Sequence, residues 1–166
     1  MLTKFYPDEY HESVFSVDYT GLFGAGITNL IFDIDNTLAP FDTPEPTTQC
    51  RSLLMGLKEQ GFSVALLSNN KAARVETFNS TLGLVCVWKA KKPKKTGVMR
   101  ALELLGDAKP QTTALIGDQL FTDIWCARRV GLRAILVRPQ SPRDEFLVKI
   151  KRYAEKPILW IYNKSN

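Results

Sequence analysis

Short apolar segments alternate with segments of helical periodicity along most of this chain, and that alternation restricts the fold more than any other feature. Five apolar runs are predicted strands, at residues 29–33, 63–67, 84–88, 112–116 and 133–137. A predicted helix follows each of them, at residues 47–60, 71–81, 95–105, 121–129 and 143–155. Strands separated by helices usually form a parallel sheet with crossover connections. The sequence therefore predicts an α/β fold.

The length of 166 residues is sufficient for one domain with a substantial core. We expect a single domain over residues 1–166, in which residues 1–28 form an N-terminal extension and residues 143–166 a C-terminal helix and tail. The glycine-rich segment 21–26 superficially resembles a dinucleotide-binding loop. It precedes a strand instead of following one and lacks the third glycine, so a flexible linker is the expected structure.

Composition limits which cellular compartment and which kinds of partner we expect. The three cysteines are widely spaced and odd in number, which favours buried thiols in a reducing, cytoplasmic environment over disulfides. The N-terminus does not have the pattern of a signal peptide, and no apolar run approaches the roughly 20 residues that span a bilayer. The net charge of +5 indicates an anionic partner, which leaves phosphorylated substrates, nucleic acids and membrane surfaces as candidates.

Polar side chains follow four of the predicted strands directly. Asp33 and Asp35 follow the first strand, Ser68 and Asn69 the second, a lysine-rich segment the third, and the segment 117–123 the fourth. In open parallel sheets, ligands bind in the crevice at the carboxyl ends of the strands. We therefore expect these groups to meet in one site.

Two aspartates at the end of a buried strand predict phosphoryl transfer assisted by a metal. Their mutual repulsion and desolvation are unfavourable unless a cation lies nearby. Mg²⁺ prefers about six oxygen ligands, which the carboxylates of Asp33 and Asp118 and the backbone carbonyl of Asp35 can supply in part. With charge neutralised in this way, Asp33 can attack phosphorus and form an aspartyl phosphate.

The remaining groups suit the other needs of this reaction. Asp35 can protonate the leaving group and then activate water. Ser68 can donate a hydrogen bond to a phosphoryl oxygen, and Thr37 and Asn69 are further candidates for substrate binding. One lysine among Lys91, Lys92, Lys94 and Lys95 can pair with both the nucleophile and the phosphate. Asp123 is expected to orient that lysine or the waters of the metal.

Four motifs in order resemble those of the haloacid dehalogenase (HAD) phosphatase superfamily. They are DIDNT at 33–37, SNN at 68–70, KP at 92–93 and GDQLFTD at 117–123. The FYPDEY segment at residues 5–10 extends the similarity toward the YqeG branch of subfamily IIIA, some of whose relatives are phosphatidylglycerophosphate phosphatases.

The resemblance implies a Rossmann-like, doubly wound and mostly parallel five-stranded sheet in the order 5-4-1-2-3, with helices on both faces. It also implies Asp33 as nucleophile, Asp35 as acid/base and Mg²⁺ as cofactor. It selects Lys92 among the lysines, because the lysine of this superfamily usually precedes a proline.

The short spacings between the motifs leave no room for a sizeable cap domain, so we expect an open site and a large or surface-presented substrate. In the last helix, one face is formed by Phe146, Leu147, Ile150, Tyr153 and Ala154, and another carries the basic residues Lys149, Arg152 and Lys156. The first interpretation is that this helix packs on the sheet with its basic residues outward. The alternative is peripheral contact with an anionic membrane, helped by Trp160 and Tyr162.

Two other function classes remain to be compared with a phosphatase. A receiver-like signalling module also has a phosphorylated aspartate at a strand end, but it usually lacks an acid at the position of Asp35. A nucleic-acid-binding protein with a vestigial site would use the lysine run, although nucleic acid is not the expected partner. A calcium-binding EF-hand loop is excluded, because Leu38 and Pro44 occupy the positions that require Gly and Glu.

Overall fold

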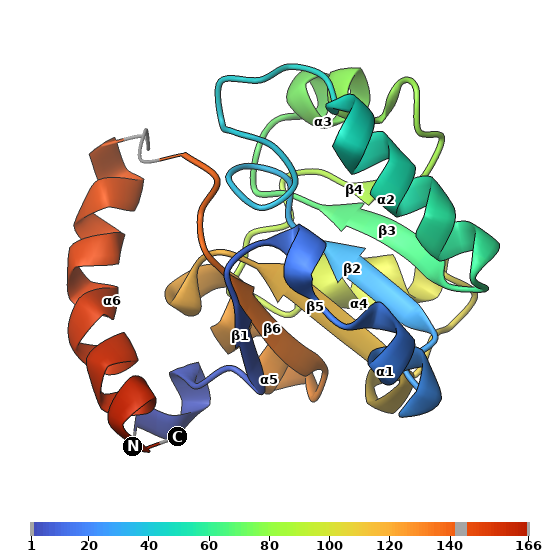
Figure 1. Cartoon of the computed structure of the whole chain (residues 1–166). Helices are drawn as coiled ribbons and strands as arrows, with labels where there is room; N and C mark the ends of the chain where they lie inside the picture. The colour runs from blue at the N-terminus through green and yellow to red at the C-terminus, as the bar shows by residue number, and fades with distance from the viewer. Residues whose placement is uncertain (1, 142–145, 166) are drawn as a thin grey trace.

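Six parallel strands form one sheet in the computed structural model, which describes residues 2–141 and 146–165 and, in the last helix, the side chains of 153–162 and 164 (Figure 1). The five predicted strands are all present, as Asn29–Phe32 (β2), Ser63–Leu67 (β3), Val85–Val87 (β4), Thr113–Gly117 (β5) and Arg133–Val137 (β6). The strand order is β1-β6-β5-β2-β3-β4. The predicted order 5-4-1-2-3 of the five strands is therefore confirmed, and their parallel pairing with it.

The prediction of five strands missed the edge strand Glu9–His11 (β1), which pairs in parallel with β6. Its three residues contain one aromatic side chain, Tyr10, and therefore no apolar run that could identify the strand. Asp8 holds it in place, because its backbone N–H donates to the Ala134 carbonyl (2.7 Å) and its carboxylate accepts from the Ala134 N–H (2.8 Å). His11 packs at this edge, with Nε2 2.9 Å from a carboxylate oxygen of Glu9.

Helices cover both faces of the sheet and enclose two apolar clusters. Tyr19–Gly24 (α1), Thr48–Glu59 (α2) and Ala72–Asn79 (α3) pack with one cluster, and Thr96–Leu104 (α4) and Trp125–Val130 (α5) with the other. Alternate residues of β2 point to opposite faces, since Leu30 and Phe32 belong to the first cluster and Ile31 to the second. Burial on both faces explains why the strands are continuous apolar runs.

Short helical turns complete the connections. They are Leu2–Phe5 (η1), Val14–Ser16 (η2), Pro110–Thr112 (η3) and the π-helical turn Leu120–Ile124 (η4). The helix predicted at 121–129 is thus divided into η4 and α5. The segments between β2 and β3 and between β3 and β4 contain one loop and one helix each, which leaves the site without an inserted cap in the described chain.

The expected linker at residues 21–26 is wrong, because most of that segment lies in α1. The Asp18 side chain caps this helix by accepting a hydrogen bond from the Gly21 N–H (2.9 Å), and the helix buries Tyr19 and Leu22. A side-chain cap and two apolar anchors stabilise a helix despite its two glycines.

The last helix, Phe146–Ser165 (α6), extends ten residues beyond its predicted end at 155 and contains Pro157. Of the apolar face predicted for it, Phe146, Leu147 and Ile150 lie outside the described side chains, as do Lys149 and Arg152. The prediction is wrong for Tyr153 and Ala154, which are exposed. The helix packs through buried Glu155 and Ile158 instead, and the Tyr162 ring contacts that of Tyr6 edge-on. No helix within the described residues is long and apolar enough to cross a membrane.

Candidate active site

The carboxyl ends of β2 and β5 bring two aspartates together at the centre of the sheet. The two strands are neighbours with Phe32 opposite Ile116, and the chain continues into Asp33 and, after Gly117, into Asp118. The Asp33 N–H still donates to the Ile116 carbonyl (2.9 Å), so the nucleophile candidate begins on the rigid sheet.

Three buried carboxylates form a compact acidic cluster at this point. Asp33, Asp118 and Asp123 each offer an oxygen, and these oxygens lie within 4.8 Å of one another. The Thr37 hydroxyl lies 3.4 Å from Asp33 Oδ2 and 3.3 Å from Asp118 Oδ1. Thr37, a candidate for substrate binding by sequence, thus lies beside two of the acids.

Lys92 reaches this cluster, whereas Lys91, Lys94 and Lys95 are exposed. Its Nζ donates to Asp33 Oδ1 (2.5 Å), to Asp123 Oδ1 (2.6 Å) and to the Leu67 carbonyl (3.1 Å). Burial lowers the pKa of Lys92, but Asp123 and Asp33 more than offset this, so that its pKa is raised and the ammonium persists. Burial raises the pKa of Asp33, Lys92 lowers it, and the neighbouring acids Asp123, Asp118 and Asp35 raise it again.

The excess of acids in the cluster fits a divalent cation. Three carboxyl groups share a buried space with one ammonium group. Burial and the neighbouring acids raise the pKa of Asp33 well above its usual range despite Lys92, so a cation would favour the carboxylate form. Carboxylate oxygens are the ligands that Mg²⁺ prefers. Both oxygens of Asp123 accept hydrogen bonds, from Lys92 and from the Gln119 N–H, whereas Asp33 bonds Lys92 through Oδ1, so Asp33 and Asp118 are the better candidates for ligands. The donor set present therefore fits Mg²⁺.

Asn69 positions Lys92 through its backbone. Asn69 Oδ1 accepts from the Lys92 N–H (2.7 Å), and Asn69 Nδ2 donates to the Lys92 carbonyl (3.2 Å). Both polar ends of the Asn69 side chain are thus occupied by the lysine backbone. The geometry assigns Asn69 to the support of Lys92, a contact that sequence reasoning did not anticipate.

Gly117 makes room for Asp123. A Cβ atom at Gly117 would lie 2.4 Å from both Cβ and Cγ of Asp123. The Asp123 carboxylate also accepts from the Gln119 N–H (3.1 Å) through its second oxygen, which leaves Oδ1 directed at Lys92. The missing side chain at Gly117 is therefore what allows Asp123 to approach the lysine.

Asp35 lies apart from the acidic cluster, paired with an arginine that sequence reasoning missed. Arg74 of α3 donates from Nε (3.1 Å) and Nη2 (2.9 Å) to the same oxygen, Asp35 Oδ1. Its Nη1 donates to the Pro44 carbonyl (2.9 Å), and Asn70 Nδ2 lies 3.4 Å from Asp35 Oδ2. The sequence contains one indication of this contact: Arg74 lies four residues after Asn70, on the first turn of α3.

Ser68 lies at the end of β3 and is almost fully buried. Its Oγ accepts from the Asn70 N–H (3.0 Å), which forms the turn into α3. Because the oxygen is the acceptor there, the hydroxyl hydrogen can be donated to a phosphoryl oxygen.

Gln140 is a further residue that motif reasoning missed. Its Nε2 donates to the Thr37 carbonyl (2.8 Å), and its backbone N–H donates to the Asn36 carbonyl (2.9 Å). Asn36 has a positive φ of 64°, a conformation that asparagine tolerates better than most residues. The segment after β6 therefore braces the loop that carries Asp33 and Asp35.

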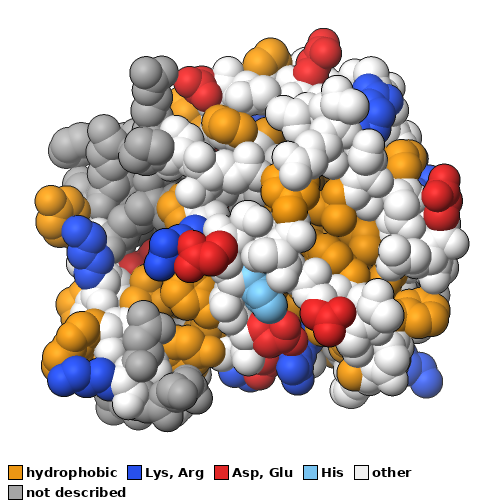
Figure 2. Space-filling view, in the orientation of Figure 1, with side chains coloured by type: hydrophobic (Ala, Val, Ile, Leu, Met, Phe, Trp, Pro, Cys, Tyr) orange, Lys and Arg blue, Asp and Glu red, His pale blue; other side chains and the backbone are white. Residues whose placement is uncertain are grey.

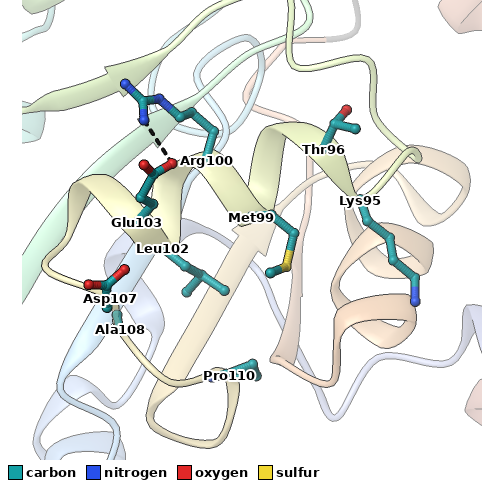
Figure 3. Close-up of a pocket in the computed structure, with 9 residues that line it drawn as sticks. All are labelled: Lys95, Thr96, Met99, Arg100, Leu102, Glu103, Asp107, Ala108 and Pro110. Carbon is teal, nitrogen blue, oxygen red and sulfur yellow. Dashed lines mark ion pairs between the residues drawn. The ribbon is translucent and has the colours of Figure 1, made fainter.

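A hollow of about 570 Å³ lies elsewhere, along the exposed side of α4 (Figure 3). Met99, Leu102 and Pro110 line it together with charged side chains such as Lys95 and Arg100. Its lining comes from α4 and the loop after that helix, so it is separate from the strand ends that carry the acidic cluster.

Comparisons with known proteins agree with this site. A family model described as HAD-hydrolase-like matches residues 89–158. The chain is 35% identical over 160 residues to the probable phosphatase YqeG of Bacillus subtilis (strain 168), a match that covers 96% of this chain and 92% of that protein. It is 28% identical over 155 residues to the chloroplastic phosphatidylglycerophosphate phosphatase 1 of Chlamydomonas reinhardtii, covering 87% of this chain and 56% of that protein.

A solved structure shares the fold. The cobalt-bound deoxy-D-mannose-octulosonate 8-phosphate phosphatase YrbI of Haemophilus influenzae aligns with a TM-score of 0.58, covering 85% of this chain and 92% of that chain at 18% identity. Similarity at this level of identity shows the fold alone. Together these matches favour neither a receiver module nor a nucleic-acid-binding protein.

Proposed function

Because the chain belongs to the HAD superfamily, in the family of the phosphatase YqeG, we propose that it is a Mg²⁺-dependent phosphomonoester hydrolase that acts through an aspartyl phosphate on Asp33. The observation that carries the proposal is the buried cluster in which three carboxyl groups, those of Asp33, Asp118 and Asp123, lie together with the single ammonium group of Lys92. A structural ion pair alone would not require the third carboxylate. Mg²⁺ held by Asp33, Asp118 and the Asp35 carbonyl would supply charge neutralisation for an anionic substrate.

The first half of the reaction transfers the phosphoryl group to the enzyme. A carboxylate oxygen of Asp33 forms a bond to phosphorus, and the bond from phosphorus to the ester oxygen breaks. Asp35 donates a proton to the departing oxygen, which leaves as an alcohol. Lys92 stays paired with Asp33 and stabilises the charge that moves onto the phosphoryl oxygens.

The second half regenerates the enzyme. Asp35 takes a proton from water as that water attacks phosphorus, and the bond between phosphorus and Asp33 breaks to release inorganic phosphate. We assign the hydroxyls of Ser68 and Thr37 to hydrogen bonds with the phosphoryl oxygens of the substrate. Asn69 and Asp123 position Lys92. Asn69 bonds the backbone of the lysine, and Asp123 bonds its ammonium group.

The substrate class follows from the short connections around the site. One loop and one helix separate β2 from β3, and the same is true of β3 and β4. Without a cap, a phosphate that projects from a larger body can reach Asp33. We propose a large or surface-presented phosphomonoester, with phosphatidylglycerophosphate as the specific substrate, for a cytoplasmic protein in peripheral contact with an anionic membrane. The phosphatidylglycerophosphate phosphatase of Chlamydomonas reinhardtii among the relatives supports that choice.

Phosphate release from phosphatidylglycerophosphate, a phosphopeptide and p-nitrophenyl phosphate tests the proposal, with Mg²⁺ and with excess EDTA. We expect hydrolysis only with the metal, fastest for the lipid, and none above background for Asp33→Asn. Full turnover by Asp33→Asn or in EDTA would falsify the mechanism. Faster turnover of the phosphopeptide would refute the lipid substrate but not the chemistry.

A further inference from the structure

The outward side of α6 presents aromatic and basic side chains in one row. Tyr153 and Trp160 are 73% and 60% exposed, among the most exposed large apolar side chains of the described chain. Lys156 and Lys164 are exposed as well. These four residues, here called the α6 stripe, are spaced i, i+3, i+7 and i+11, which places them on one side of a helix. The opposite side packs on the protein through Glu155 and Ile158.

The lysines of the α6 stripe lie against its rings. Lys156 Nζ is 4.6 Å from the ring centroid of Tyr153, and Lys164 Nζ is 4.0 Å from that of Trp160. The one acid among the described side chains of α6, Glu155, is buried. Figure 2 shows orange and blue side chains next to each other along this edge of the molecule. A surface that touches the rings therefore meets positive charge at the same level.

The helix that carries the α6 stripe is bonded to η4, one of whose residues belongs to the acidic cluster. Glu155 Oε1 accepts from the Phe121 N–H (3.1 Å) of η4, the turn that contains Asp123. Earlier in the chain, Gln140 donates to the Thr37 carbonyl (2.8 Å). In Figure 1, α6 forms the outermost layer of the molecule, next to the sheet edge of β1 and β6.

We propose that the α6 stripe binds the interface of an anionic lipid bilayer. Tyrosine and tryptophan prefer the boundary between headgroups and acyl chains, because they have an apolar ring and a polar end. Lysines near an anionic leaflet strengthen binding by about fivefold each. A convex helix face has no groove to hold a nucleic-acid strand, so a flat anionic surface is the better match.

This inference deepens the proposed function, because it identifies the surface that would hold a lipid phosphate near the site. It rests on the proposed function for the identity of the substrate. The binding itself does not require Asp33 or turnover, so the two can be tested separately.

Co-sedimentation with phosphatidylcholine vesicles, with and without phosphatidylglycerol, tests the α6 stripe. We expect the wild type to bind the anionic vesicles, and less so as salt rises. The double variant Lys156→Gln/Lys164→Gln should bind about 25-fold more weakly, the product of two fivefold losses. Tyr153→Ala/Trp160→Ala should also lose binding. The matched controls Lys58→Gln/Lys109→Gln and Met99→Ala change exposed residues elsewhere and should bind as the wild type does.

Hydrolysis of p-nitrophenyl phosphate by the same variants separates membrane binding from catalysis, because the α6 stripe does not contact this soluble ester. Vesicle binding that depends on the α6 stripe supports the inference even if no phosphate ester is hydrolysed, an outcome that would refute the proposed function. Equal binding to neutral and anionic vesicles, no binding at all, or equal losses in the control variants would overturn the inference. Capture of a single-stranded oligonucleotide through the two lysines, without vesicle binding, would overturn it too.

Discussion

At the scale of single residues, the position of Lys92 depends on the amide side chain of Asn69, which bonds the backbone of the lysine. Asn69 bonds both the N–H and the carbonyl of Lys92, and the lysine then bonds Asp33 and Asp123. Mutating a residue that orients a catalytic group typically lowers activity by about 10- to 100-fold. We therefore treat Asn69 as a positioning residue for the lysine.

Asn69→Ala should lower kcat by about 10- to 100-fold with a smaller effect on KM, because the ammonium group loses its alignment with the nucleophile. Steady-state hydrolysis of p-nitrophenyl phosphate measures both constants. Asn79→Ala is a matched control, since Asn79 makes the same two hydrogen bonds to the backbone of Leu84 (2.7 and 2.9 Å) away from the site. Both variants should lose similar stability, about 0.5–1.5 kcal/mol for each hydrogen bond. An equal loss of kcat in the control would show that Asn69 acts only on stability.

Arg74 orients Asp35 by a different arrangement. Both of its donors to this carboxylate reach Oδ1, while its third nitrogen bonds the Pro44 carbonyl. Oδ2 has only the longer contact with Asn70 Nδ2 (3.4 Å), so we expect it to be the oxygen that exchanges a proton with the substrate or water. The arginine thus fixes the orientation of the carboxylate that we propose as the acid/base.

Arg74→Ala should reduce kcat about tenfold or more for an alkyl phosphate and less for p-nitrophenyl phosphate, whose leaving group needs little protonation. Comparing the two substrates measures the difference. Arg51→Ala serves as the control, because Arg51 also ties a helix to a backbone carbonyl, that of Thr81 (2.8 Å), but does not contact Asp35. Identical losses for both substrates in Arg74→Ala would argue against its role in orienting the acid/base.

At the scale of elements, the close approach of two segments at Gly117 offers a direct test of how the site is built. Gly117→Ala should lower the free energy of unfolding by about 1–3 kcal/mol and reduce activity, because the new methyl group would displace Asp123 from Lys92. Gly56→Ala in α2 is the control, since its Cβ meets nothing within 4 Å, and alanine should stabilise that helix by up to about 1 kcal/mol. Chemical denaturation measures both. A Gly117→Ala protein of unchanged stability and activity would contradict the assigned packing.

The same scale shows what sequence patterns could predict. The central strands were predictable because burial on both faces demands apolar runs, and the helices because Gly61 and Gly131, with φ of 100° and 86°, follow α2 and α5. The strand β1 was not, since its three residues include a single aromatic side chain, Tyr10, and so form no apolar run. The extent of α6 was also missed, because the helix continues through Pro157.

For the candidate site, the strand-end rule predicts that Asp33 and Asp118 lie near one another, as they do in the acidic cluster, since the parallel topology dictates which ends meet. Contacts between distant segments carried no such signal. The bonds from Gln140 to Thr37 and from Arg74 to Asp35 span 103 and 39 positions and depend on how loops pack. Periodicity and motif spacing do not encode those contacts.

At the scale of the whole molecule, the acidic cluster links metal binding to global stability. Three carboxyl groups and one ammonium group meet where β2, β5 and η4 converge, and repulsion among the acids is unfavourable there without a cation. A cation that binds the folded state alone stabilises it, by about 2.7 kcal/mol when its concentration is 100 times its Kd. The stability of the protein should therefore depend on Mg²⁺.

Mg²⁺ should raise the Tm of the wild type, whereas the same ionic strength of a sodium salt should not. Asp118→Asn should have opposite effects on the stability of the metal-free protein and on the rise in Tm that Mg²⁺ causes. Without metal it should be more stable than the wild type, because one repelling charge is removed, and Mg²⁺ should raise its Tm far less, because a ligand is lost. Asp107→Asn is the control, since this exposed residue with φ of 58° lies after α4 and asparagine tolerates that conformation. Thermal unfolding of the three proteins with Mg²⁺ and with EDTA measures these changes in Tm. An equal rise in Tm with Mg²⁺ for Asp118→Asn and the wild type would show that the metal binds elsewhere.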